Sequence, residues 1–238
     1  MPAVFVHGVP DTQRVWRALI TRLRRDDVVT LSLPGFGCEI PTGFDCSKEA
    51  YCDWLLRELD NIDRPIDLVA HDWGAILALR VTSLEPTLVR TWAVGGAPLD
   101  PEYEWHRAAK LWQTPEIGEQ VMERLAPETL ASGLVAAGVP SADAAETARH
   151  VDPAMKRSIL ALYRSAVHVG VEWEPGLARI ESPGLVIWGA DDPYVAPTLG
   201  SRLASRTGAR FVSFPDCSHW WQLQRAGEVA KELEALWS

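Results

Sequence analysis

Two kinds of apolar pattern alternate along the chain. Short unbroken apolar runs are typical of strands that are buried on both faces, and apolar residues that recur every three or four positions are typical of helices. Strands are predicted at residues 3–6, 28–33, 66–70, 89–94, 185–188 and 211–214. Helices are predicted at residues 15–23, 47–62, 74–84 and 226–236. The alternation predicts an α/β fold with a mostly parallel sheet of about six strands and helices on both faces.

A long stretch without strand character separates the fourth and fifth predicted strands. It contains helical patterns at residues 117–125, 127–137, 142–150 and 155–167. Two consecutive parallel strands need only one crossover helix, so this stretch is too long for a simple connection. We therefore expect residues 1–98 and 180–238 to form a core, and residues 99–179 to form a helical cap inserted into it.

Composition narrows the class of partner. The chain has 238 residues, with 23 basic and 32 acidic side chains, and a formal net charge of −9. This charge argues against nucleic acid and anionic membranes as partners and leaves a small molecule as the expected ligand. The four cysteines include no C-x-x-C pair, and the N-terminus shows no signal-peptide pattern, which together favour the cytoplasm. No metal or cofactor motif is present, and we expect a monomer or homodimer.

A possible nucleophile follows the third predicted strand. In open parallel sheets, sites lie at the carboxyl ends of the strands. The sequence Ala70-His71-Asp72-Trp73-Gly74 has a nucleophile position flanked by small residues, which is the pattern of a tight strand-to-helix turn that exposes its central side chain. Asp72 occupies that central position. The alternative is that Asp72 simply caps the helix that follows.

Three further motifs follow other predicted strands. The backbone N–H of Val9, in His7-Gly8-Val9-Pro10, can join that of Trp73 in an oxyanion hole. Asp192 lies in the turn at residues 189–195 and can orient a histidine, and His219 follows the last predicted strand. Each motif alone is compatible with an ordinary turn. Together they give the order nucleophile, acid, histidine, which is that of the α/β-hydrolase triad.

Two other carboxylates are weaker candidates for the acid. Asp191 is adjacent to Asp192 but less suitable by register, and Asp100 lies further away in the sequence.

With these motifs in this order, the sequence resembles the α/β-hydrolase superfamily over nearly its full length. The HGVP and HDWGA motifs are similar to those of its aspartate-nucleophile branch, which holds epoxide hydrolases and haloalkane dehalogenases, and LPGFG at residues 33–37 is similar to a loop of the same proteins. Members usually have two strands before the HGxP loop, whereas only six residues precede His7 here. The resemblance therefore implies a core without the first two strands, with residues 28–33 at a sheet edge that a second copy can cover.

An aspartate nucleophile limits the chemistry. Its attack on an ester carbonyl would give an anhydride, whereas attack on a saturated carbon gives an alkyl ester. Asp72 thus points to the opening of an epoxide or the expulsion of halide. His219, held by Asp192, would activate a water molecule to hydrolyse the ester.

The leaving group decides between the two substrates. The resemblance implies cap tyrosines that donate to an epoxide oxygen, for which Tyr163 and then Tyr103 are the candidates. A halide needs N–H donors, for which Trp73 is available, and Trp105 or Trp112 in the cap can supply a second indole. Val9 stands where many dehalogenases have asparagine, so it offers no side-chain donor.

The rest of the sequence favours a neutral, apolar substrate. Trp73 replaces the arginine that fluoroacetate-type dehalogenases carry after the nucleophile, and Trp220 is expected to wall the pocket. The leading hypothesis is an epoxide hydrolase, and the alternative is a haloalkane dehalogenase. A ligand-binding relative with little turnover is a third hypothesis. An acyl hydrolase fits poorly, because aspartate replaces serine.

Overall fold

The computed structural model describes residues 1–238 and contains one six-stranded sheet. All its strand pairs are parallel, in the order β2-β1-β3-β4-β5-β6. The strands are β1 (Ala3–Val6), β2 (Val28–Leu31), β3 (Ile66–His71), β4 (Val89–Gly95), β5 (Gly184–Gly189) and β6 (Arg210–Phe214). The predicted α/β-hydrolase-like sheet of about six parallel strands is therefore confirmed.

Burial explains why the strands were readable from the sequence. Every residue of β1 and β3 is buried, because helices cover both faces of the sheet. The two edge strands β2 and β6 are only partly buried. The prediction that residues 28–31 lie at an edge is confirmed by the strand order.

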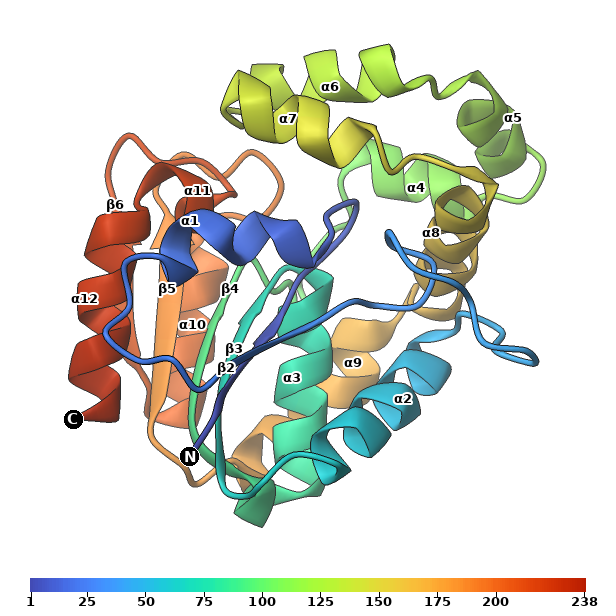
Figure 1. Cartoon of the computed structure of the whole chain (residues 1–238). Coiled ribbons are helices and arrows are strands. Elements are labelled where there is room, and N and C mark those ends of the chain that lie inside the picture. Colours follow the sequence, from blue (N-terminus) through green and yellow to red (C-terminus); the bar gives the residue numbers. More distant parts are fainter.

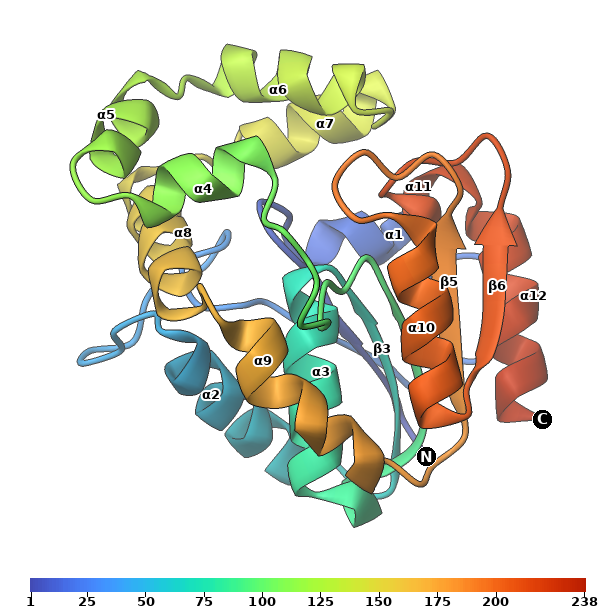
Figure 2. The same cartoon turned by 180° about the vertical axis from the view of Figure 1, so that it is seen from behind.

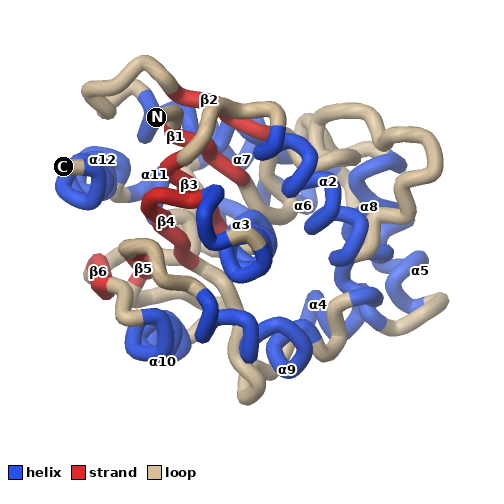
Figure 3. Tube along the Cα trace, turned by 90° about the horizontal axis from the view of Figure 1, so that it is seen from below, coloured by secondary structure: helices blue, strands red, loops and turns tan.

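Two groups of helices cover the two faces of the sheet (Figure 3). One face carries a 3-10 turn (Gln13–Trp16), α1 (Arg17–Ile20), α11 (Trp221–Gln224) and α12 (Ala226–Trp237). The other carries α2 (Lys48–Asp60), α3 (Trp73–Leu84), α10 (Pro197–Thr207) and, against α3, the segment formed by α9 (Val169–Trp173) and a 3-10 helix (Glu174–Arg179). A short 3-10 turn (Pro86–Leu88) precedes β4. Ser47 caps α2 through the N–H of Ala50, as a cap at this position predicts.

A third layer of helices lies above the carboxyl ends of the strands (Figures 1 and 2). It consists of α4 (Arg107–Gln113), α5 (Ile117–Arg124), α6 (Pro127–Ala136), α7 (Ser141–Ala148) and α8 (Pro153–Ser165). The hydrophobic pattern predicts α5 to α8 but not α4, which has only seven residues. The division of the chain at residues 98 and 179 stays a prediction. None of the helices has the length and apolarity needed to cross a membrane.

Candidate active site

Asp72 sits on the tight turn that joins β3 to α3. Its backbone has φ of 52° and ψ of −124°, a conformation that costs energy for a residue with a side chain. Two glycines make room for this turn. A Cβ on Gly74 would lie 2.4 Å from the carbonyl oxygen of Val6, and a Cβ on Gly8 would lie 2.4 Å from Cβ of Asp72. The small residues of the motif are therefore steric requirements of the turn.

The two oxygens of Asp72 have different environments. Oδ2 accepts a hydrogen bond of 2.7 Å from the backbone N–H of Val9. The backbone N–H of Trp73, the first residue of α3, has no partner within the chain. Oδ1 lies 3.6 Å from Nε2 of His219. The backbone N–H of Val9, the predicted oxyanion-hole donor, is therefore hydrogen-bonded to the nucleophile candidate.

His219 is held on its far side by Asp192. Its Nδ1–H donates to Oδ2 of Asp192 across 2.7 Å, and Oδ1 of Asp192 accepts the backbone N–H groups of Tyr194 and Val195. The structure thus brings Asp72, His219 and Asp192 into one chain of contacts. Asp100, one of the weaker candidates for the acid, instead forms ion pairs with Arg202 and Arg206.

A buried histidine supports the backbone of His219. Nδ1 of His71 accepts a hydrogen bond of 3.1 Å from the side-chain amide of Gln222, so its Nε2 carries the proton and donates to the carbonyl of His219 across 3.0 Å. Burial, followed by the charge of His219, lowers the pKa of His71 to about 3. His71 is therefore neutral and acts as a structural contact.

The three charged groups set each other's ionisation. Burial alone would lower the pKa of His219, but the charge and hydrogen bond of Asp192, together with the nearby carboxylate of Asp72, outweigh it and raise this pKa to about 10. Burial alone would raise the pKa of both carboxyls, yet it is outweighed by His219 and by backbone N–H groups, and both pKa values are lowered. At neutral pH the site therefore holds an imidazolium between two carboxylates.

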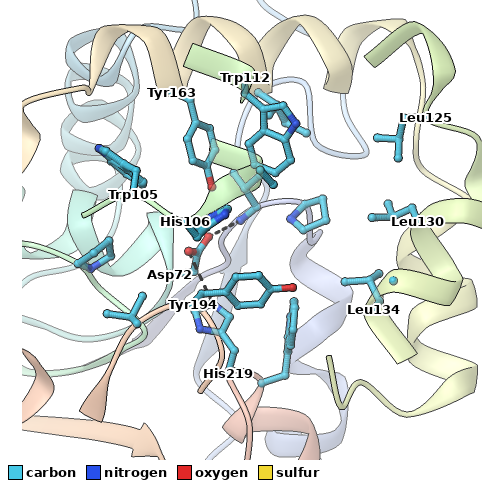
Figure 4. Close-up of a pocket in the computed structure, with 18 of the residues that line it drawn as sticks. Asp72, Trp105, His106, Trp112, Leu125, Leu130, Leu134, Tyr163, Tyr194 and His219 are labelled. Carbon is cyan, nitrogen blue, oxygen red and sulfur yellow. Dashed lines mark hydrogen bonds and ion pairs between the residues drawn. The ribbon is translucent and has the colours of Figure 1, made fainter. Parts of the chain in front are cut away.

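These groups open onto a cavity of about 270 Å³ beneath the upper helices (Figure 4). Most of its wall is apolar or aromatic, and neither lysine nor arginine lines it. Such a wall suits a neutral substrate. No group of three or more histidine, cysteine or carboxylate side chains is arranged to hold a metal ion. The predicted site residues that line the cavity are Val9, Asp72, Tyr103, Trp105, Trp112, Tyr163, His219 and Trp220.

Tyr163, on α8, is the predicted cap donor that faces the nucleophile candidate. Figure 4 shows its hydroxyl pointing toward Asp72. Burial and the charge of Asp72 raise the pKa of Tyr163 well above its usual value, so it stays a neutral O–H donor. Its ring packs against Trp73, Trp105 and Trp112, with centroids 4.8 to 5.4 Å apart. Tight packing of this kind fixes the direction of the hydroxyl.

The donors of two other predicted residues are already in use. The hydroxyl of Tyr103 donates to the backbone carbonyl of Tyr194, and the indole N–H of Trp105 donates to the carbonyl of Val167, each across 3.3 Å. The sequence predicted that each residue would donate to a leaving group. Both line the cavity, but neither has a free donor, so this prediction is wrong for both. The indole N–H of Trp73, by contrast, has no partner. Trp73 lies behind Trp105, on which it stacks.

Sequence reasoning missed His106, which lines the cavity just before α4. Its Nδ1 accepts the N–H of Ala109 as the cap of that helix, so Nε2 carries the proton. Burial lowers the pKa of His106 and keeps the ring neutral. It lies near enough to Asp72 for the charge of that carboxylate to act on it, in the same cavity (Figure 4). The sequence held no signal for this role, because α4 itself is not predicted by the hydrophobic pattern.

Asp11 is a second residue that the sequence did not single out. It is 2% exposed, and its carboxylate accepts the indole N–H of Trp220 across 2.9 Å and the hydroxyl of Thr147 on α7 across 3.4 Å. Burial raises the pKa of Asp11 to about 7. Through these hydrogen bonds, Asp11 connects the core to α7. It lies close to His219 but does not line the cavity.

Comparison with known proteins identifies the family and agrees with the fold. Residues 3–232 match the model of the alpha/beta hydrolase family. A haloalkane dehalogenase of Mycolicibacterium paratuberculosis is 25% identical, over 98% of this chain and 82% of the relative. An (E)-2-((N-methylformamido)methylene)succinate hydrolase of Acinetobacter baylyi is also 25% identical, over 85% of this chain and 77% of the relative. The crystal structure of the haloalkane dehalogenase DbeA from Bradyrhizobium elkani superposes with a TM-score of 0.80 at 21% identity, over 99% of this chain and 90% of that one.

Proposed function

The chain belongs to the alpha/beta hydrolase family, and we propose that it hydrolyses small neutral epoxides to diols through an ester formed on Asp72. The observation that carries the proposal is the placement of two neutral donors, the hydroxyl of Tyr163 and the Nε2–H of His106, beside a carboxylate on a nucleophile turn. The resemblance to a dehalogenase over almost the whole chain supports hydrolysis at a saturated carbon.

The first step is attack by Oδ1 of Asp72, because Oδ2 is held by Val9. A C–O bond forms between Oδ1 and an epoxide carbon, and the C–O bond from that carbon to the ring oxygen breaks. The electron pair of the broken bond stays on the ring oxygen, which accepts hydrogen bonds from Tyr163 and His106 and takes up one proton. The raised pKa of Tyr163 makes it a hydrogen-bond donor that keeps its own proton, so the proton is taken from the imidazolium of His219 or from water.

The second step uses the change in charge at Asp72. Once Asp72 is an ester, its negative charge no longer supports the imidazolium, and the pKa of His219 falls. Neutral His219 then removes a proton from a water molecule as that water attacks the ester carbonyl carbon. The backbone N–H groups of Val9 and Trp73, at the positive end of α3, stabilise the oxyanion. Collapse of this intermediate breaks the ester C–O bond, and the leaving alkoxide takes the proton from His219 as the diol leaves. Asp72 then carries the oxygen and the remaining proton of the water as a carboxylic acid. This proton passes to neutral His219, which restores the carboxylate and the imidazolium of the resting site.

The donors favour an oxygen leaving group over halide. An epoxide oxygen gains negative charge and a proton as the ring opens, which a phenol and a neutral imidazole N–H both assist. Of the indoles suggested for halide, that of Trp105 is bonded to Val167. The free indole N–H of Trp73 and the full-length dehalogenase relative keep a haloalkane dehalogenase as the second candidate function.

Two substrates supplied separately test the proposal. The protein is incubated with styrene oxide and with 1-bromobutane, and diol and bromide are quantified. Diol from styrene oxide that is lost in Asp72→Ala is the expected result. Bromide without diol would replace the proposal with the second candidate. Turnover of neither, with no ester detectable on a His219→Gln variant, would favour a ligand-binding protein.

A further inference from the structure

The cavity of the candidate active site shares two lining residues with a second, more open cavity. The second cavity measures about 470 Å³ and lies between α6 and the turns that follow β5 and β6. Gly133 of α6 and Tyr194 of the turn after β5 line both cavities. Figure 4 shows the hydroxyl of Tyr194 pointing across the first cavity toward Leu134 of α6. The two cavities therefore adjoin at this tyrosine and glycine.

The residues that line the two cavities change from aromatic near Asp72, to aliphatic along α6, to small residues at the end of α6. Near Asp72 the wall is formed by aromatic rings, among them Trp112 and Tyr163. Leu125, Leu130 and Leu134 form the aliphatic wall on the α6 side (Figure 4). Beyond Gly133, the second cavity is open to solvent, with Ala136, Ala137 and Gly138 on its α6 side and Asp191, Pro193 and Ser218 on the other. The apolar α6 side of these two cavities suits an unbranched chain.

Gly133 is an exposed residue of α6 at the point where the two cavities adjoin. A Cβ at this position would meet no atom within 4 Å, so nothing in the packing of α6 requires glycine. Glycine is also unfavourable in the interior of a helix, where α6 places it. Neither backbone geometry nor packing explains why glycine stands at this position. A requirement for space for a ligand would explain it.

The geometry points to a substrate that is a terminal epoxide on an unbranched apolar chain, with the chain passing between Gly133 and Tyr194 into the second cavity. This inference names the substrate class of the proposed function and rests on it. The reacting carbon lies at Asp72, the first methylenes lie against the leucines of α6, and the end of a longer chain lies against the small residues beyond Gly133. Gly133 thereby sets the longest chain that the protein accepts.

The test compares Gly133→Leu with the wild type on 1,2-epoxyalkanes of increasing length. Leucine favours the helix more than glycine does, so the variant is expected to fold at least as stably. We expect kcat/KM of the wild type to rise about threefold for each added methylene that is buried. In Gly133→Leu this rise should stop at a shorter chain, with a loss of about tenfold on 1,2-epoxydecane and a change within about twofold on 1,2-epoxybutane. Val135→Leu, on an exposed position of α6, is the matched control and should keep the profile of the wild type.

A binding series separates this inference from the proposed function. Affinity for 1,2-alkanediols, followed by tryptophan fluorescence, reports chain length without any turnover. If the protein hydrolyses no epoxide, but its affinity for diols rises with length and Gly133→Leu removes the rise, the proposed function fails and the chain channel stands. The same length profile in Gly133→Leu and in the wild type would overturn the inference, whatever the activity.

Discussion

Nε2 of His219 lies 3.6 Å from Oδ1 of Asp72, which is longer than a strong hydrogen bond. The other oxygen, Oδ2, is held at 2.7 Å by the N–H of Val9. One oxygen is therefore fixed where an oxyanion would form, and the other is free of a close donor and remains available for attack. The predictions below test the proposal that follows from this asymmetry.

The first prediction concerns Asp192. Two carboxylates keep His219 protonated, and Asp192 has the larger effect. Replacing Asp192 by asparagine removes its charge, so the pKa of His219 should fall well below about 10. A loss of about 10²–10⁴-fold in kcat/KM is expected, because the imidazole also loses its orientation. NMR titration of the His219 ring in both proteins measures the pKa, and an unchanged value in Asp192→Asn would contradict the assignment of this contact.

The same contact predicts how stability depends on pH. The pKa of His219 is raised on folding from 6.5 to about 10. Its contribution to stability is therefore fully present below pH 6.5 and is lost as the pH rises through 10. Thermal unfolding of the wild type between pH 6 and 10 should show this loss, and Asp192→Asn should show a flatter dependence.

The second prediction concerns Tyr163 and His106. Tyr163→Phe removes the hydroxyl but keeps the ring that packs on Trp73, so it should lower kcat on epoxides by about 10²-fold with little change in stability. His106→Asn keeps a side chain able to cap α4 and should lower the same rate less. Stopped-flow measurement of ester formation checks both. Full activity of Tyr163→Phe on styrene oxide would remove Tyr163 from the mechanism.

The third prediction concerns Asp11. Burial raises its pKa on folding from 3.8 to about 7, so its contribution to stability is present below pH 3.8 and is lost as the pH rises through 7. Asp11→Asn keeps an acceptor for Trp220 and carries no charge. It should therefore raise the free energy of unfolding above pH 8, by at most about 4 kcal/mol, and by little at pH 4. Denaturant unfolding at the two pH values checks this, with the exposed Asp53→Asn as control; equal effects at both would contradict it.

The sequence predicted the fold well because both of its strong signals are local. The strands are short apolar runs between helices, and β1 and β3 are buried on both faces, so no alternation of polar residues obscures them. The turn at Asp72 is also marked by a short local motif, although the contacts below 3 Å that require Gly8 and Gly74 join this turn to the segment at the end of β1. Helix α4 was missed because seven residues give too little periodicity for a prediction.

The site residues that directly follow a strand could be predicted from the sequence. The availability of a donor could not, because it depends on tertiary packing. Asp72, Asp192 and His219 all lie just beyond strand ends, so topology alone brings them together. Tyr103 and Trp105 reach the cavity, but whether their donors are free depends on contacts with Tyr194 and Val167 that no spacing reveals. The proton position of His106 likewise follows from a cap contact visible only in three dimensions.

The most direct test of the central claim is the mass of the His219→Gln protein after incubation with styrene oxide. Glutamine cannot act as the base for the second step, so an ester on Asp72 should accumulate. The expected result is a mass increase equal to one whole styrene oxide, mapped to the peptide that contains Asp72 and absent from the His219→Gln, Asp72→Ala double variant. An unmodified His219→Gln protein, or an adduct that persists when Asp72 is alanine, would contradict the proposal that Asp72 is the nucleophile.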